Sequence, residues 1–424
     1  MILNHLKEAP NLCKVPVAGT AEGISIRTIS TIGIPRTELP VNDTDYSYER
    51  NRSITKNTPV GLQPYTHEEC KNERKIAKKY FKEYTANVFK LDAYKAGITF
   101  PIEFSDTRTY LERCADLFSF LATQYIDKAI KLKNDPKEAS HMLAYITAGV
   151  VSALHIDINC KKLFNPYVGE TFVGRWPNGA TLYAEQSYHH PPVSDYEIIG
   201  PNNSWYCSAH TSFDVSTSIN QIEIKQNGTF TLKIKDGPVY EWTFPTATVS
   251  GILKDIKTVR VKGEIKIVDT TNKLVSHVEM CPNLKKIPSN HYFHSMKEAN
   301  ASTVYGEITS LNSKNEKKNK SHNNNKHNGS HHHHDENCEN IFYGDYCKEL
   351  YFNNEKIWDI NENFAQRPIK TISDDLLLPS DSRYRYDRYL FIEGKQSEAE
   401  KAKLALETIQ RREEKLRNPL KKGK

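Results

Sequence analysis

Hydrophobic and polar positions follow a helical period near the start of this chain, a period of two in its middle and a helical period again near its end. Over residues 73–89, apolar side chains recur at helical spacing, so one face of the predicted helix is apolar and the other is rich in lysine. Two further helices are predicted over residues 107–132 and 136–154. An Asp-Pro-Lys-Glu sequence at 135–138 predicts a capping box with proline in the first helical position.

The segment 181–352 alternates between apolar and polar residues, which predicts β-strands. Asn227-Gly228 lies between two alternating runs, and this dipeptide is typical of a type I′ hairpin turn. Many short sequential strands predict an antiparallel meander, which is most economically closed into a barrel without free edges. The predicted fold class is therefore α+β: a large, antiparallel, near-closed β-barrel with N-terminal helices and a C-terminal helical segment over 371–417.

Residues 312–340 interrupt the strand pattern with a low-complexity tract of nine Asn, five Lys and six His. The tract lies between two strand-like runs, so we predict an insertion in a hairpin loop, where added length costs little free energy. The run His331–His334 could bind divalent metals loosely. No ordered cysteine or carboxylate framework surrounds it, so we predict no dedicated metal site.

The C-terminal segment predicts a short helix over 386–392 and a longer one over 398–417, which Ser397 and Glu400 would open as a capping box. The predicted apolar stripe of the longer helix is Ala402, Leu406 and Ile409. Its charged residues Lys403, Glu407 and Arg411 are spaced four apart. Such charges commonly form exposed pairs that contribute a few tenths of a kcal/mol each, and this interpretation stays open beside a binding role.

The remaining sequence suggests one large domain with two tails. Residues 1–70 show no sustained periodicity and predict an extension that is partly disordered or packed on the surface, and 418–424 form a basic tail. The domain would then span 71–417, with 71–96 as a candidate lid helix. Residues 1–14 lack the apolar core of a signal peptide, and the longest apolar stretch, 143–154, is too short to cross a bilayer. We expect a cytosolic, soluble monomer.

Charge and cysteine content exclude several classes of function. Lysine and arginine total 58 against 52 acidic residues, and the net charge of +6 permits contact with anionic membranes. No basic stripe interleaved with aromatic residues indicates nucleic-acid binding. The eight cysteines contain no Cys-x-x-Cys pair, which favours reduced thiols in the cytosol and gives no support to redox catalysis.

Residues 185–192 read Glu-Gln-Ser-Tyr-His-His-Pro-Pro and hold the most informative side chains of the chain. Pro191 biases His190 toward extended geometry, in which successive side chains leave the backbone on opposite sides. His189 and His190 would then not converge on one metal ion. Each could instead donate a hydrogen bond to an anion with several oxygens, although a His pair before two prolines is also common as a purely structural feature.

This octapeptide resembles the Glu-Gln-Val-Ser-His-His-Pro-Pro fingerprint of the oxysterol-binding protein family. Residues 162–170, Lys-Leu-Phe-Asn-Pro-Tyr-Val-Gly-Glu, and residues 378–385, Leu-Pro-Ser-Asp-Ser-Arg-Tyr-Arg, are similar to two further elements of that family. The resemblance runs from about Gly97 to about Arg417, without a separate phosphoinositide-binding PH module. Ser187 and Tyr188 replace the usual Val-Ser, and Leu163 replaces the usual Pro.

The resemblance implies a tunnel inside the barrel that takes one lipid at a time, either a sterol or phosphatidylinositol 4-phosphate. By residue-to-residue match, the 4-phosphate would meet His189, His190 and Arg411. The inositol ring and its diester would be held by Lys162, Asn165, Lys403 and Glu407. The implied function is a carrier that extracts these lipids and exchanges them between organelle membranes, which it contacts peripherally.

Two other functions stay open at this point. A phosphoinositide or lipid hydrolase would need an activated nucleophile, yet the sequence holds no Cys-x5-Arg loop, no Gly-x-Ser-x-Gly elbow and no His-Glu-x-x-His helix. Ser187 is the one candidate nucleophile beside the histidines, and we predict no enzyme, no catalytic residue and no cofactor. A lipid-gated sensor or scaffold is the other alternative.

Overall fold

The computed structural model describes residues 56–88, 102–156, 158, 161–189, 191–218, 220–252, 254, 256–288, 292–311, 340–363 and 378–417. The side chains of 79–88, 217 and 413–417 are not part of this description. Predictions for residues 1–55, the tract 312–339 with His331–His334, His190 and the tail 418–424 lie outside the described residues.

Within the described ranges, seventeen strands form one antiparallel sheet. Its strands are β1 (Lys56–Thr58), β2 (Gly61–Gln63), β5 (Thr171–Arg175), β6 (Thr181–Tyr188), β7 (Val193–Ile199), β8 (Trp205–Ser218), β9 (Gln221–Asn227), β10 (Phe230–Ile234), β11 (Val239–Trp242), β12 (Thr246–Ser250), β13 (Thr258–Lys262), β14 (Glu264–Asp269), β15 (Leu274–Met280), β16 (Thr303–Ser310), β17 (Ile341–Asp345), β18 (Glu349–Phe352) and β19 (Glu355–Asp359). The short strands β3 (Ser105–Thr109) and β4 (Lys162–Phe164) form a separate parallel pair. The predicted large antiparallel sheet is confirmed.

The described α-helices lie between β2 and β5 and after β19 in the chain. They are α4 (His67–Val88), α5 (Tyr110–Asp116), α6 (Ile126–Leu132), α7 (Ala139–Ser152), α9 (Tyr386–Ile392) and α10 (Gln396–Arg417). A π-helical turn, η2 (Leu121–Tyr125), leads into α6. Short 3₁₀ turns are η1 (Ile102–Phe104), η3 (Pro136–Glu138), η4 (Ala153–His155), η5 (Pro201–Asn203), η6 (Leu284–Lys286) and η8 (Ser382–Tyr384). No helix among the described residues is long and apolar enough to cross a membrane.

The single helix predicted over 107–132 is wrong, because the structure divides this segment into β3, α5, η2 and α6. Thr109 stops the helix from starting earlier, since its side chain caps α5 and its backbone N–H donates to Glu112 at 2.8 Å. At the next predicted helix start, Asp135 caps the N–H of Lys137 as expected. The capping box with Glu138 does not follow, because the first turn is 3₁₀ and Glu138 pairs with His141 at 3.0 Å.

The hairpin predicted at Asn227-Gly228 is also wrong. Both β9 and β10 run antiparallel to β8, with Asn227 opposite Ser212 and Phe230 opposite Ala209, so the chain bends here without reversing. Gly228 supplies the bend with a φ of +102°. On their far sides β9 pairs with β12 and β10 with β11, so the bend divides the sheet into two continuations. The dipeptide correctly indicates a positive φ at Gly228, but a positive φ is compatible with a bend in a strand as well as with a hairpin turn.

Replacing Gly228 should be far more damaging than replacing Gly263, which also has a positive φ of +95°. A Cβ at Gly228 would lie 2.1 Å from the carbonyl oxygen of His210, whereas a Cβ at Gly263 meets nothing within 4 Å. We expect Gly228→Ala to lower the free energy of unfolding by about 3 kcal/mol or more, and Gly263→Ala by about 1 kcal/mol. Urea denaturation of both variants measures this difference, and equal losses would contradict the close approach.

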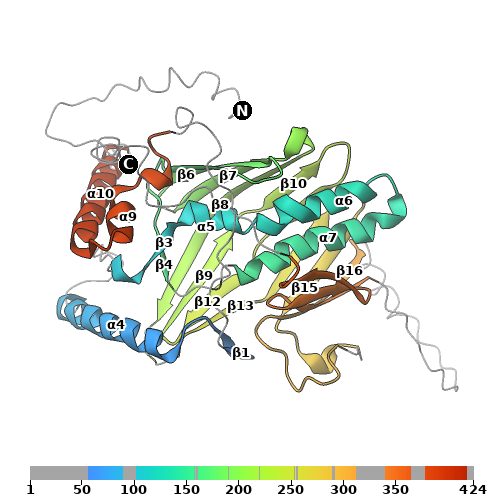
Figure 1. Ribbon diagram of the computed structural model, residues 1–424, viewed down its shortest axis with the longest axis horizontal. Helices are drawn as coiled ribbons and strands as arrows, with labels where there is room; N and C mark the ends of the chain where they lie inside the picture. Colours follow the sequence, from blue (N-terminus) through green and yellow to red (C-terminus); the bar gives the residue numbers. More distant parts are fainter. Residues whose placement is uncertain are drawn as a thin grey trace, which may run out of the picture.

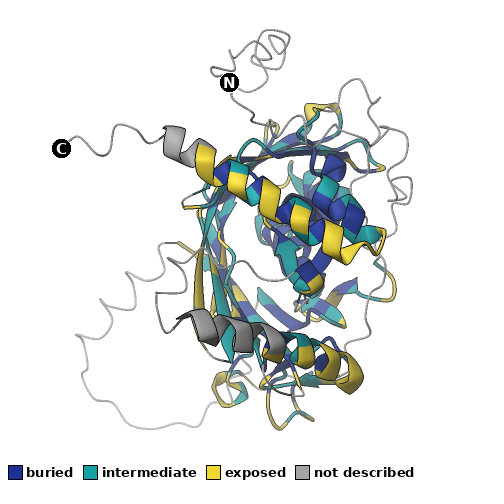
Figure 2. Cartoon of the chain, turned by 90° about the vertical axis from the view of Figure 1, so that its left-hand side faces the viewer, coloured by how far each residue is buried: buried dark blue, intermediate teal, exposed yellow. Residues whose placement is uncertain are grey.

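The sheet curves so that its concave side faces α6 and α7 (Figure 1, Figure 2). Side chains of α5 to α7 and of the sheet share one apolar core, whose largest buried members include Trp176, Trp205, Trp242 and Trp358. No hydrogen-bonded ladder joins the outer strands β5 and β19 among the described residues. Closure into a barrel therefore stays a prediction.

The sheet begins earlier in the chain than the predicted domain boundary at residue 71. The hairpin of β1 and β2 belongs to it, because Leu62 of β2 pairs with Val259 of β13. Helix α4 follows directly and is tied to the same region by an ion pair between Glu73 and the buried Lys257. Composition places residues 56–70 in the N-terminal extension because it does not reveal three-residue strands.

Candidate functional site

A cluster of charged side chains forms where β4 meets α10, at the end of the molecule that carries α9 (Figure 1). Lys162 of β4 interacts electrostatically with Lys403, Glu407 and Glu400 of α10 and with Arg385, which directly precedes α9. We call these five residues the α10 cluster. Two segments 241 positions apart in sequence, 162 and 403, are thereby brought together.

The buried face of α10 is not the apolar stripe that the sequence predicts. Of Ala402, Leu406 and Ile409, only Leu406 is buried. Among the described side chains of α10, the buried ones are Ala399, Lys403, Leu406 and Gln410. The helix is therefore turned so that a lysine and a glutamine, each less than a tenth exposed, face the body of the protein.

Glu400 fixes the start of α10 to the rest of the chain. Its carboxylate accepts a hydrogen bond from the backbone N–H of Ile102 at 2.7 Å and an ion pair from Lys403 at 3.3 Å. Helix α10 begins at Gln396, before the predicted capping box of Ser397 and Glu400. Glu400, which the sequence pattern predicts as part of a cap, instead connects η1, ahead of β3, to the α10 cluster.

Lys162 carries the clearest electrostatic perturbation of the cluster. Burial lowers its pKa to about 8, and the positive charges of Lys403 and Arg385 act in the same direction. Glu407 and Glu400 oppose the shift without cancelling it. An anionic ligand placed here would favour the charged form of Lys162 against the effect of burial and of its cationic neighbours.

The loop from Asn165 to Glu170 is held by Arg385. The guanidinium donates to the carbonyl oxygen of Asn165 at 2.6 Å and to Glu170 at 3.2 Å, and it pairs with Asp387 at 2.7 Å. It also lies over the ring of Tyr167, 4.5 Å from the centroid. The backbone of Asn165 is thus fixed while its side chain is exposed.

Buried Glu170 completes this loop. Its carboxylate accepts from the backbone N–H of Tyr167 at 3.0 Å. Burial raises the pKa of Glu170 to about 7, although Arg385 and that N–H favour the ionised form. Sequence reasoning did not select Arg385 or Glu170 as site residues, yet both stand in the motif-like segments at 162–170 and 378–385.

The same loop is joined to the end of β6, which leads to the histidine pair. Gly169 donates to the carbonyl oxygen of Gln186 at 2.8 Å, and Gln186 donates to that of Glu170 at 2.9 Å. His189 is half-buried and follows three residues after Gln186, a reach of about 10 Å. Its backbone is therefore near the loop that carries Asn165, and His190 lies outside the described residues.

Arg411 and Glu407 form the common surface pair that the sequence left open as an alternative. Their separation is 3.0 Å at i,i+4 spacing, and the Arg411 side chain is 51% exposed. Lys403, one turn before Glu407, is only 5% exposed and does not belong to that surface. Seven site residues are predicted from the sequence. The structure groups Lys162, Lys403 and Glu407 directly, and Arg411 forms an ion pair with Glu407. Backbone hydrogen bonds join the loop of Asn165 to the strand that leads to His189.

The chemistry that this arrangement supports is anion binding. Among the described residues, no group of three or more His, Cys, Asp or Glu side chains could hold a metal ion. Ser187, the candidate nucleophile, is exposed, and its hydroxyl donates to the carbonyl oxygen of Val193 at 3.4 Å. That bond leaves the serine oriented toward the backbone.

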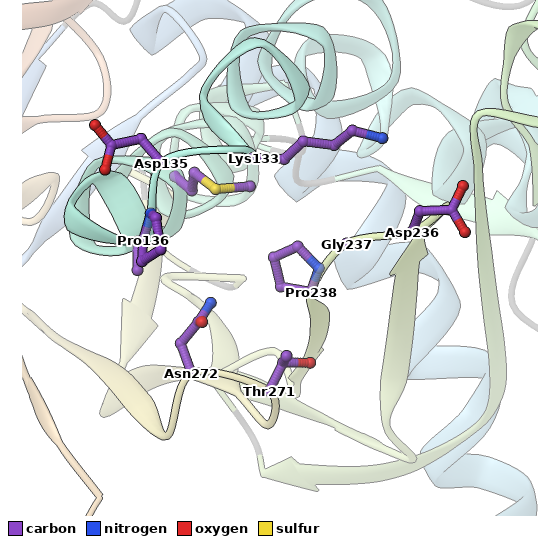
Figure 3. A pocket seen from close by; sticks show the side chains of 10 residues that line it. Lys133, Asp135, Pro136, Asp236, Gly237, Pro238, Thr271 and Asn272 are labelled. Carbon is purple, nitrogen blue, oxygen red and sulfur yellow. The ribbon is translucent and has the colours of Figure 1, made fainter.

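Two hollows among the described residues lie away from the α10 cluster. One, of about 260 Å³, is lined by Asp135 and Pro136 from the turn between α6 and α7 and by the hairpin residues Pro238, Thr271 and Asn272 (Figure 3). This turn lies at the opposite end of the molecule from α10 (Figure 1). The other, of about 270 Å³, lies in the loop after β15. Neither is a tunnel that opens at the α10 cluster, so the tunnel remains a prediction.

A family profile and similar curated proteins agree on one family. A sequence profile described as "Oxysterol-binding protein" matches residues 96–424. Oxysterol-binding protein 9 of Dictyostelium discoideum is 25% identical over 323 residues, which are 74% of this chain and 69% of that protein. Oxysterol-binding protein-related protein 1 of Mus musculus is 27% identical over 220 residues, half of this chain but 22% of that protein.

Two solved structures share the fold. The Osh3 ORD of Saccharomyces cerevisiae, in complex with PI(4)P, has a TM-score of 0.55 at 20% identity and covers 78% of this chain and 82% of its own. The Osh1 ORD domain, in complex with ergosterol, has a TM-score of 0.57 at 21% identity and covers 76% of each chain. At these identities the likeness concerns the fold.

Proposed function

Because this chain belongs to the oxysterol-binding protein family, we propose that it is a lipid-transfer protein for phosphatidylinositol 4-phosphate and a sterol. It extracts one lipid from a membrane, carries it and exchanges it at another membrane as a peripheral, monomeric carrier. Relatives of the same fold have been solved with PI(4)P and with ergosterol. The α10 cluster is the observation in this chain that carries the proposal.

The phosphorylated head group fits the charge of the α10 cluster. A phosphomonoester carries about −1.5 to −2 charges near neutral pH. Lys162 and Lys403 supply the cations, and an anion beside Lys162 would offset the burial that lowers its pKa and the repulsion from Lys403. Glu407 would accept from ring hydroxyls while aligning Arg411, which it already binds at 3.0 Å. His189, His190 and Arg411 would meet the 4-phosphate, and Asn165 the diester or ring.

The apolar part of the cargo would occupy the predicted tunnel inside the curved sheet. Burying roughly 500 Å² of lipid surface at about 25 cal/mol per Å² gives on the order of 12 kcal/mol gross. The lipid gives up a comparable amount on leaving a bilayer. Exchange between membranes can then be nearly thermoneutral, which is what a carrier needs.

Transfer between liposomes tests the proposal directly. Donor liposomes carry phosphatidylinositol 4-phosphate or a fluorescent sterol, acceptors carry neither, and the full chain is added at catalytic amounts. We expect both lipids to move with no release of inositol phosphate or fatty acid. Lipid transfer no faster than the spontaneous rate would contradict the carrier hypothesis. Accumulation of hydrolysis products would support the hydrolase alternative.

Head-group binding should weaken as pH rises above 8. The free protein's Lys162, with its pKa at about 8, must be protonated to bind an anion, and that protonation becomes unfavourable at higher pH. The phosphate is already fully ionised there. We expect affinity to fall by up to about tenfold per pH unit between 8 and 9.5, until the pKa of the bound form is reached.

Lys162→Arg is the matched control for this pH effect, because arginine stays charged over the whole range. Its affinity should be nearly flat between pH 7.5 and 9.5. Titration calorimetry with a short-chain phosphatidylinositol 4-phosphate gives both profiles. The same slope in both proteins would assign the pH dependence to another group.

A further inference from the structure

The buried face of α10 carries two polar side chains, Lys403 and Gln410, which are 5% and 7% exposed. Seven residues of α-helix bring the chain back to within about 20° of the same direction, about 10 Å further along the axis. Glu407 lies between them, three residues before Gln410. Gln410 therefore continues the row of side chains that forms the α10 cluster.

Only one of these two polar groups has a partner of its own. Lys403 pairs with Glu400 at 3.3 Å. The Nε2 atom of Gln410 is buried and makes no hydrogen bond among the described residues. Turning the amide over would bury the oxygen in its place, so one polar end stays unsatisfied in either orientation.

Such a group has a cost in the free protein. A buried donor or acceptor without a partner destabilises the folded state, because its hydrogen bond to water is lost and not replaced. Leucine has a similar volume and would avoid this cost at the same position beside Leu406. A polar side chain here is thus explained if another state of the protein supplies the missing partner.

We propose that Gln410 is a further binding residue for the phosphorylated head group, donating a hydrogen bond to one of its oxygens. This inference rests on the proposed function. The neighbouring Arg411 is 51% exposed and charged, whereas Gln410 is buried and neutral. A buried neutral donor stabilises a ligand that has an oxygen at one particular position, whereas it stabilises negative charge elsewhere on the ligand much less. Gln410 therefore contributes to specificity.

The test compares Gln410→Leu with Gln396→Leu, the same substitution at the exposed first residue of α10. The full chain is titrated with dioctanoyl phosphatidylinositol 4-phosphate, and its melting temperature is measured without ligand. We expect Gln410→Leu to bind about five- to tenfold more weakly. Its melting temperature should equal or exceed that of the wild type, because the unsatisfied group is gone, and Gln396→Leu should match the wild type in both measurements.

Three results would overturn the inference. Wild-type affinity in Gln410→Leu, together with loss of binding in Lys403→Met, would remove Gln410 from an otherwise valid site. A melting temperature several degrees lower would mean that Gln410 supports the fold and acts on binding indirectly. If the wild type itself fails to bind the short-chain lipid, the proposed function falls first and this inference falls with it.

Discussion

Lys403→Met is expected to weaken phosphatidylinositol 4-phosphate binding by about a hundredfold or more and to stop its transfer. Lys403 is 5% exposed, so its charge acts on a ligand with little screening by water. Removing one partner of a buried charge pair typically costs about 2–5 kcal/mol of binding free energy. Methionine keeps most of the side-chain volume, so the packing of α10 should survive.

Lys401→Met is the matched control, since Lys401 is exposed on the same helix two residues earlier. It should bind and transfer like the wild type. Sterol binding should persist in Lys403→Met, because a sterol has no phosphate to meet the lysine. Affinity in Lys403→Met within about threefold of the control would show that the head group binds elsewhere.

Local sequence signals located the segment that holds β6 to β18 and the C-terminal helices, but they did not settle how the strands connect. Alternation identifies a strand and the side of the sheet that each residue faces. It cannot distinguish a reversal from a bend, because Asn227-Gly228 satisfies the backbone geometry of both. The bend is decided by β8, a 14-residue strand long enough to pair with β9 and β10 in succession.

The prediction of a single helix over 107–132 is wrong for a related reason. Apolar periodicity continues through the breaks, because α5, η2 and α6 all turn apolar residues to the same core. The capping interaction between Thr109 and Glu112 marks the true start of α5, and the sequence carried that signal at spacing three. Three-residue strands such as β1 and β2 are too short for any periodicity to show.

For the site, the sequence alone offered spacing and a family resemblance, and each gave a different part. Four-residue spacing placed Lys403, Glu407 and Arg411 near one another on α10, as the structure shows. It could not tell that Lys403 is buried while Arg411 is exposed, because that depends on how α10 is turned against η1 and α9. The sequence does not single out Gln410 as a site residue for the same reason, because a glutamine on a charged helix is ordinarily exposed.

Arg388→Met should lower the free energy of unfolding by about 3–5 kcal/mol at neutral pH, since it leaves a buried carboxylate without its partner. Arg388 of α9 pairs with Glu112 of α5 at 3.1 Å and donates to the carbonyl oxygen of Thr107 at 2.7 Å. These contacts join the C-terminal segment to the helices before the sheet. Arg412→Met, at an exposed arginine of α10, should stay within about 0.5 kcal/mol of the wild type in urea denaturation.

The pH dependence of this loss separates charge from packing. Burial acts to raise the pKa of Glu112, but Arg388 and Arg108 outweigh it, so the pKa is lower than usual in the wild type. Without Arg388 the folded-state pKa should rise above the unfolded value, so the variant gains relative stability as pH falls from 7 toward 4.5. The deficit should therefore shrink on acidification, and adding Glu112→Gln should remove most of that pH dependence. A deficit that is constant with pH would mean that lost packing, and not the ion pair, holds α9 against α5.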